Sequence, residues 1–153
     1  VYAGRRWHTR SMSERDLNDV LGVEIVEVTA DRVVTRFTIG TEHLQPFGIP
    51  HGGIYCAVHE STASIAAQTW LGEKGIIVGT SNLTDFLRQA KVGDTITVSA
   101  SPIHRGRTQQ LWRTESRDQD DRLVAQGQVR LANLDRTPSP EALERMRGVA
   151  GGG

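Results

Sequence analysis

Residues 51–72 read HGGIYCAVHESTASIAAQTWLG, and this stretch decides the fold. Between Gly53 and Gly72 no glycine or proline interrupts the run and alanine recurs, which predicts one long helix over residues 53–71. The residues near helical spacing, which predict its buried face, are Ile54, Ala57, Val58, Ser61, Ile65 and Ala66. Because many of its side chains are small, a sheet can wrap closely around this helix.

The rest of the chain predicts strands. Residues 23–29 and 32–39 indicate a hairpin that turns at Ala30-Asp31, and further strands are expected at 76–85, 94–103, 108–117 and 122–134. In the strand at 94–103, Ile96, Val98 and Ala100 alternate with threonine and serine, as in a half-buried strand. One helix among antiparallel meanders predicts an α+β fold, a curved antiparallel sheet around one long central helix.

A chain of 153 residues is expected to form one domain, which we place at residues 13–135. Residues 1–12 are expected to be a disordered arm, and Ser13 to cap a short helix that ends near Gly22. The tail, residues 136–153, is expected to carry a short helix at 141–147. No apolar run approaches the ~20 residues that a transmembrane helix needs.

The composition excludes several classes of function. Lysine and arginine number 18, as do aspartate and glutamate, so the zero net charge points to neither nucleic acid nor an anionic membrane. The single Cys56 fits a reducing, cytoplasmic compartment, and we expect it to be a small core residue. His59-Glu60 begins like a zincin motif, but Ala63 stands where the second histidine is required, so we expect no metal.

The loop before the helix and the helix itself carry the candidate chemistry. Gly52, at the predicted helix N-terminus, can offer its N–H and the positive end of the helix dipole to a carbonyl oxygen. Glu60 lies in mid-helix among small residues, where a buried carboxylate would normally be excluded unless something uses it. A carbonyl-binding group and a carboxylate so close in sequence indicate acyl transfer or hydrolysis.

The run from Gln45 to Ser64 resembles the signature of PaaI-type acyl-CoA thioesterases, and is closest to the 4-hydroxybenzoyl-CoA thioesterases that use a helix glutamate. The shared residues are Gln45, Phe47-Gly48, His51-Gly52-Gly53, Glu60 and Ser64, with further likeness at 78–82, 86–88 and 104–108. The resemblance covers roughly residues 21–133 and implies the hotdog fold. It implies hydrolysis of an acyl-CoA to free acid and coenzyme A, with no metal or organic cofactor.

The resemblance also implies a role for each residue. Glu60 would attack the carbonyl or activate a water, and both versions stay open. Ser64, one helical turn further on, would orient the carboxylate or the water. Gln45 would hold the carbonyl or the water by its amide, while His51 would brace the loop. Each residue also has a purely structural interpretation: a tight turn for Gly52, a solvent-facing carboxylate for Glu60, helix packing for Ser64 and ordinary loop roles for Gln45 and His51.

The spacing of two of these residues implies a shared site. Gly52 and Glu60 are eight residues apart, or about 12 Å along a helix. One carbonyl cannot touch both on the same helix, so Glu60 must meet the Gly52 end of another subunit's helix. We therefore expect a homodimer with two equal sites across a twofold axis. We also expect such dimers to form a dimer of dimers, although the sequence leaves the choice between dimer and tetramer open.

Further residues are candidates for contacts with the substrate. Arg105, Arg107 and Thr108 lie in a tight connection and suit coenzyme A phosphates, although an ordinary charged turn explains them as well. Arg88 is a weaker candidate for the same role. The expected walls of the acyl pocket are Tyr55, Phe86 and Leu87, and for Trp70 we favour core packing.

Two other functions stay open at this stage. A non-catalytic acyl-CoA binding module would use the same cleft but give Glu60 no purpose. A hotdog hydratase or dehydratase would use a catalytic histidine with an aspartate, against which the Glu60 arrangement argues. The sequence leaves the acyl group open among aromatic, hydroxyaromatic and medium-chain thioesters.

Overall fold

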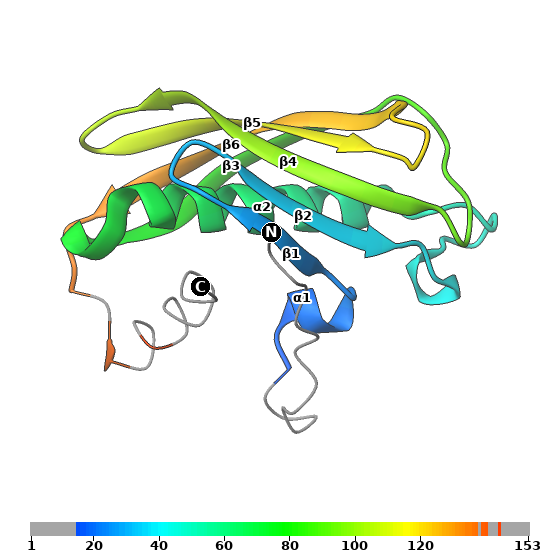
Figure 1. The fold of residues 1–153 in the computed structure, drawn as a ribbon, viewed down its shortest axis with the longest axis horizontal. Coiled ribbons are helices and arrows are strands. Elements are labelled where there is room, and N and C mark those ends of the chain that lie inside the picture. The colour runs from blue at the N-terminus through cyan, green and yellow to red at the C-terminus, as the bar shows by residue number, and fades with distance from the viewer. Residues whose placement is uncertain (1–14, 138, 141–143, 145–153) are drawn as a thin grey trace.

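The computed structural model describes residues 15–137, 139–140 and 144, and shows one antiparallel sheet that curves over one long helix (Figure 1). The strands are β1 (Glu24–Val28), β2 (Val33–Thr38), β3 (Ile76–Phe86), β4 (Thr95–Arg105), β5 (Gln109–Arg117) and β6 (Leu123–Leu134). The helices are α1 (Leu17–Val20), η2 (Thr41–His43), α2 (Gly52–Leu71) and η3 (Gly72–Lys74). This architecture confirms the predicted α+β fold.

The sheet is ordered β1-β2-β4-β5-β6-β3, so β1 and β3 are its outer strands. Strands β1 and β2 form the predicted hairpin, and β4, β5 and β6 form the predicted meander. The alternation in β4 is confirmed, because Ile96, Val98 and Ala100 are fully buried. This order leaves β3 at the edge, paired with β6 along its whole length.

One face of helix α2 packs against the sheet. The other, which we call the half-open face, carries half-buried and exposed side chains, among them Ala57, Glu60, Ser61 and Ser64. The buried residues of α2 are Ile54, Tyr55, Val58, His59, Thr62, Ala63, Ala66, Ala67 and Leu71. Our prediction of the buried face was therefore wrong for Ala57, Ser61 and Ile65, which are only half-buried. Small residues occupy both faces of this helix, so apolar spacing alone does not tell the two faces apart. Gly72 ends the helix with φ of 63°, as predicted.

Helix α1 begins one turn later than expected. Its N-cap is Asp16, whose side chain accepts a hydrogen bond from the N–H of Asp19 while the Asp19 carboxylate accepts one from the N–H of Asp16. The predicted cap, Ser13, and the arm at 1–12 lie outside the described residues. The helix expected at 141–147 does too, apart from residue 144. No helix among the described residues is long and apolar enough to cross a membrane.

His59 is a fully buried histidine in the contact between α2 and the sheet. Its Nε2 lies 2.8 Å from the Ser116 hydroxyl and its Nδ1 lies 3.2 Å from the Thr84 hydroxyl. Burial lowers the pKa of His59 from 6.5 to about 4, because a charged ring would lose its hydration. The ring is therefore neutral at physiological pH.

We expect the free energy of unfolding to fall as the pH is lowered from 6.5 to about 4. In this window the unfolded chain binds a proton at His59 and the folded chain does not, so protons favour unfolding. The stability that the neutral His59 contributes to the free energy of unfolding is fully present above pH 6.5 and amounts to about 3 kcal/mol at most. Urea unfolding from pH 7 to pH 4 measures the slope. His59→Gln should flatten it, and an unchanged slope in that variant would refute the assignment.

Candidate active site

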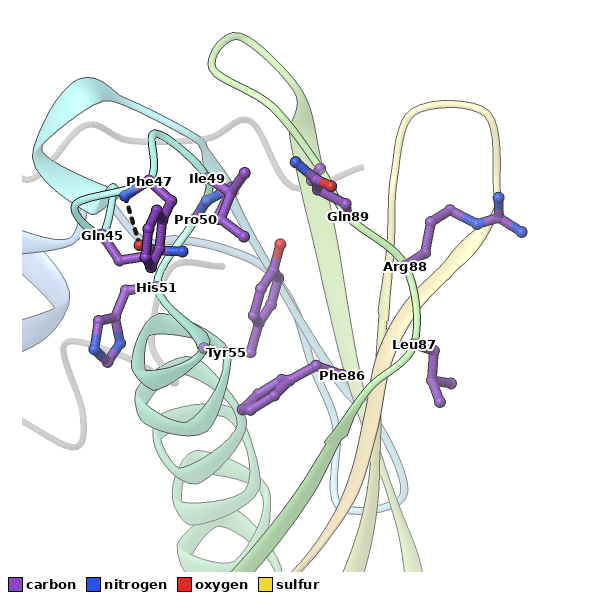
Figure 2. Close-up of a pocket in the computed structure, with 12 residues that line it drawn as sticks. Gln45, Phe47, Ile49, Pro50, His51, Tyr55, Phe86, Leu87, Arg88 and Gln89 are labelled. Carbon is purple, nitrogen blue, oxygen red and sulfur yellow. Dashed lines mark hydrogen bonds between the residues drawn. The ribbon is translucent and has the colours of Figure 1, made fainter.

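A groove of about 510 Å³ lies at the N-terminus of α2, between the loop at 45–51 and the connection that follows β3 (Figure 2). Seven of the predicted site residues line it, from three different segments: Gln45, His51, Gly52, Tyr55, Phe86, Leu87 and Arg88. The groove does not include Glu60, Ser64, Arg105, Arg107 or Thr108. The structure thus divides the predicted residues into two groups within one chain.

His51 fixes the entry into α2. It is the N-cap, and its Nδ1 accepts a hydrogen bond of 2.8 Å from the N–H of Gly53. Its own N–H donates to the carbonyl of the buried His43 at 2.8 Å, and Leu44 pairs with Pro50 to close the loop. These contacts place His51 as a brace for the loop.

The amide of Gln45 points its donor end away from the loop. Its Oε1 accepts a hydrogen bond of 2.7 Å from the N–H of Phe47, which Figure 2 shows as a dashed line. With that oxygen engaged, the NH₂ group is the part of the side chain left for another partner. An NH₂ group donates hydrogen bonds, so Gln45 suits a carbonyl oxygen at this position.

Gly52 leaves a backbone donor at the floor of the groove. The N–H groups of Gly53 and Ile54 both bond to His51, whereas no acceptor for the N–H of Gly52 occurs in the part of the chain that the structure describes. A Cβ at Gly52 would stand 2.6 Å from the Phe86 ring. Glycine is therefore required for Phe86 to close over the first turn of α2.

Aromatic rings form the inner wall of the groove. The rings of Tyr55 and Phe86 lie 6.1 Å apart, and Figure 2 shows both beside the first turns of α2. Tyr55 is buried, and its hydroxyl has no hydrogen-bond partner among the described residues. Burial, and secondarily the charge of Asp94, raises the pKa of Tyr55 to about 12, so this hydroxyl stays protonated.

Glu60 and Ser64 lie on the half-open face of α2, away from the groove. Glu60 is exposed in the single chain, so our expectation of a carboxylate buried within the chain was wrong. The side chain lies against β3, where a Cβ at Gly79 would stand 3.0 Å from its Oε1. Ser64 is half-buried one turn further along, and so is Cys56 one turn before, which corrects its placement in the core.

The turn between β4 and β5 lies at the other end of α2. Arg105 donates to Asp31 at 2.8 Å and to the carbonyl of Ala30 at 3.0 Å, and its guanidinium lies 5.5 Å from the centre of the Trp70 ring. Trp70 is next to last in α2, whereas Gly52 is first. The Arg105 contacts therefore hold the β1–β2 hairpin, and the adjacent residues of the turn, Arg107 and Thr108, are exposed.

Several groove residues were not predicted from the sequence. Ile49 and Pro50 belong to the loop that precedes α2, and Gln89 and Ala90 follow β3. The only available signal was their closeness in sequence to Gln45 and Phe86. No cluster of three or more histidine, cysteine, aspartate or glutamate residues that could hold a metal occurs among the described residues.

The chain is similar to known thioesterases and esterases. The thioesterase superfamily matches residues 47–125. The putative esterase Rv1847 of Mycobacterium tuberculosis is 46% identical over 121 residues, which cover 77% of this chain and 86% of that protein. The 1,4-dihydroxy-2-naphthoyl-CoA hydrolase of Listeria monocytogenes is 30% identical over 108 residues, covering 71% and 87%. The crystal structure of S. sahachiroi AziG superposes with a TM-score of 0.78 at 48% identity, covering 80% and 98%.

The two arginines of the β4–β5 turn are expected to differ in their effect on stability. Arg105→Ala removes the pair with Asp31 and the stacking on Trp70, which should lower the free energy of unfolding by about 1 kcal/mol. Arg107→Ala, the matched control, should change it by less than about 0.5 kcal/mol. Urea unfolding measures both. Equal effects would show that the Arg105 contacts do not form in solution.

Proposed function

The chain belongs to the thioesterase superfamily, and from this premise we propose that it hydrolyses an acyl-CoA thioester to free acid and coenzyme A. The observation that supports this most is the groove at the N-terminus of α2. Gly52, with its N–H, and Gln45, with its NH₂ group, both line this groove beside apolar walls. Two donors at a helix N-terminus suit a carbonyl oxygen that gains negative charge in the transition state.

The proposed reaction needs only groups of this chain, water and the substrate. As a general base, Glu60 takes a proton from water while the water oxygen bonds to the carbonyl carbon. The C–S bond then breaks, the thiolate leaves and it takes up the proton that Glu60 holds. As a nucleophile, Glu60 instead displaces the thiolate to form an anhydride, which water cleaves to restore the carboxylate. In either version Ser64 orients Glu60 or the water.

Each site is proposed to combine two chains. Glu60 stands about 12 Å along α2 from Gly52, outside the groove of its own chain. The half-open face of α2 carries Ala57, Ser61 and Ser64, whose small side chains would let a second α2 approach closely. A twofold axis that sets the two helices antiparallel brings Glu60 of each chain to the groove of the other. We further propose that such dimers pair into a dimer of dimers.

The proposed antiparallel pair of helices also explains how residues of both chains could contact coenzyme A. Arg88 lines the groove of its own chain. With Glu60 at the partner's groove, the C-terminal end of α2, 11 residues further on, extends about 16 Å beyond the N-terminal end of the partner's α2. The turn that carries Arg105, Arg107 and Thr108 would then lie beyond the partner's groove, where guanidinium groups suit the phosphates. For the acyl group we propose an aromatic ring, because Tyr55 and Phe86 offer ring surfaces for stacking.

The two rival functions make different experimental demands. A binding module would bind acyl-CoA and release no thiol, and a hydratase would turn over without releasing thiol. His51, the histidine in the groove, uses its Nδ1 to cap α2, which does not favour a hydratase base. The single cysteine fits a reducing compartment, and on that ground we place the enzyme in the cytoplasm.

Glu60→Gln is expected to lower kcat at least ~100-fold while acyl-CoA still binds, because it removes the proposed base or nucleophile and keeps the shape. Release of free thiol from a panel of aromatic and medium-chain acyl-CoAs measures kcat. Glu24→Gln on β1, where the carboxylate pairs with Arg36, is the matched control and should keep wild-type activity. A kcat for Glu60→Gln within a few-fold of wild type would refute the role of Glu60.

Mixing two inactive variants tests whether the site is shared. Gln45→Ala and Glu60→Ala each damage a different chain's contribution, so a mixed dimer has one site with both lesions and one with neither. Random exchange makes about half of the dimers mixed, and activity should recover to ~25% of wild type. Native mass spectrometry confirms exchange. If exchange is complete and no activity returns, the shared-site proposal fails.

A further inference from the structure

A continuous chain of hydrogen bonds ties β3 to the turn of α2 that precedes Glu60. The Nδ2 of Asn82 donates to the carbonyl of Cys56 at 2.9 Å, and the Thr84 hydroxyl donates to the Oδ1 of Asn82 at 2.8 Å. Thr84 also contacts Nδ1 of the buried His59, whose Nε2 reaches Ser116 on β5. The proposed chemistry uses none of these contacts.

The carbonyl of Cys56 sets the direction of the hydrogen bonds that follow it. Because a carbonyl can only accept, Asn82 turns its NH₂ group to Cys56 and its Oδ1 to Thr84. The Thr84 hydroxyl donates its one hydrogen to Asn82, so the Thr84 oxygen must accept a hydrogen bond from Nδ1–H of His59. A neutral imidazole protonated at Nδ1 has an acceptor at Nε2, and Ser116 therefore donates to it. Since each group has one arrangement that satisfies it, the loss of any link leaves a buried or half-buried partner without its hydrogen bond.

Strand β6, which pairs with β3, leaves room for this chain of hydrogen bonds. Gly127 on β6 pairs with Thr84, and a Cβ at Gly127 would stand 2.9 Å from the Thr84 hydroxyl and 3.2 Å from Nδ1 of His59. The same Cβ would stand 2.5 Å from the carbonyl of Leu83. A side chain at this position would push apart the groups that the hydrogen bonds bring together.

The chain of hydrogen bonds ends at the carbonyl of Cys56, which also accepts the backbone hydrogen bond of Glu60. In an α-helix the N–H of Glu60 bonds to the carbonyl four residues earlier, which is that of Cys56. The Glu60 carboxylate lies against Gly79 of β3, where the register of β3 on β6 shifts between Gly79 and Ser81. Bulges of this kind weaken the local ladder, and Asn82 is the first half-buried residue after the shift.

We propose that Asn82 is a positioning residue for Glu60, held in place by the hydrogen-bond chain through Thr84, His59 and Ser116. Its amide ties the helix turn of Glu60 to the strand on which the carboxylate lies, so that helix and strand present the carboxylate at one fixed depth. This inference rests on the proposed role of Glu60. Errors of about 1 Å in the placement of a reacting group cost roughly 100-fold in rate.

Uncharged, nearly isosteric variants test the proposal. Asn82→Leu and Thr84→Val should each lower kcat roughly 10-fold to 100-fold with KM within about twofold, because they move Glu60 and leave the groove intact. Thr84→Ser keeps the hydroxyl and should restore kcat to within about threefold of wild type. If Asn82→Leu does not fold, the Thr84 pair alone decides the outcome.

The matched control is Thr35→Val, which removes the buried hydroxyl contact of 2.7 Å to Thr62, half a turn past Glu60 on α2. It should lower stability and leave kcat unchanged. A loss of kcat in Thr35→Val equal to that in Thr84→Val would show a general effect of weakened packing and overturn the proposal. A kcat within twofold of wild type in Asn82→Leu or Thr84→Val would overturn it too.

Amide exchange separates this inference from the proposed function. The amide of Glu60 should exchange at least about tenfold faster in Asn82→Leu than in Thr35→Val, whether or not the protein hydrolyses any thioester. Equal exchange rates would refute the tie between Asn82 and the Glu60 turn. Absence of thiol release by the wild-type protein, with exchange as expected, would instead refute the proposed function.

Discussion

The rise of an α-helix, about 1.5 Å per residue, is the constraint on which the site depends. Gly52 and Glu60 belong to the same α2 and are separated by about two turns, so the proposed carbonyl-binding end and the proposed catalytic carboxylate cannot serve one thioester in one chain. The groove bears this out, because it gathers Gln45, His51 and Gly52 and leaves Glu60 outside. In the proposed site, a single chain therefore supplies two halves that lie apart, one in the groove and one outside it.

The sheet makes this division possible by covering only one side of α2. Toward the sheet, α2 presents alanines and Val58 together with His59, whose hydrogen bonds hold the helix in register. Beside the edge strand β3 it presents the exposed Glu60, and the half-buried Ser64 follows one turn further along the helix. The hydrogen-bond chain through Asn82 crosses from one side to the other, and so couples the packed core to the carboxylate.

The fold could be predicted because large apolar residues alternate plainly with threonine and serine, as at Ile96 and Val98, and because α2 is a long stretch without glycine or proline in its interior. The buried face of α2 could not be predicted, because positions 57 and 63 are both alanine. Only packing against the sheet makes Ala63 buried and leaves Ala57 half-buried. Motif residues near one another in sequence met in the groove. Arg105 found its partner Asp31 at a separation of 74 residues, which no local pattern reveals.

A crystal structure with a non-hydrolysable acyl-CoA analogue would test the shared site most directly. The result we predict is a carbonyl oxygen about 3 Å from the N–H of Gly52 in one protomer, with the Glu60 carboxylate of the other protomer facing the carbonyl carbon or a water beside it. The analogue bound with only groups of one chain within reach of its carbonyl, and no Glu60 near it, would contradict this arrangement.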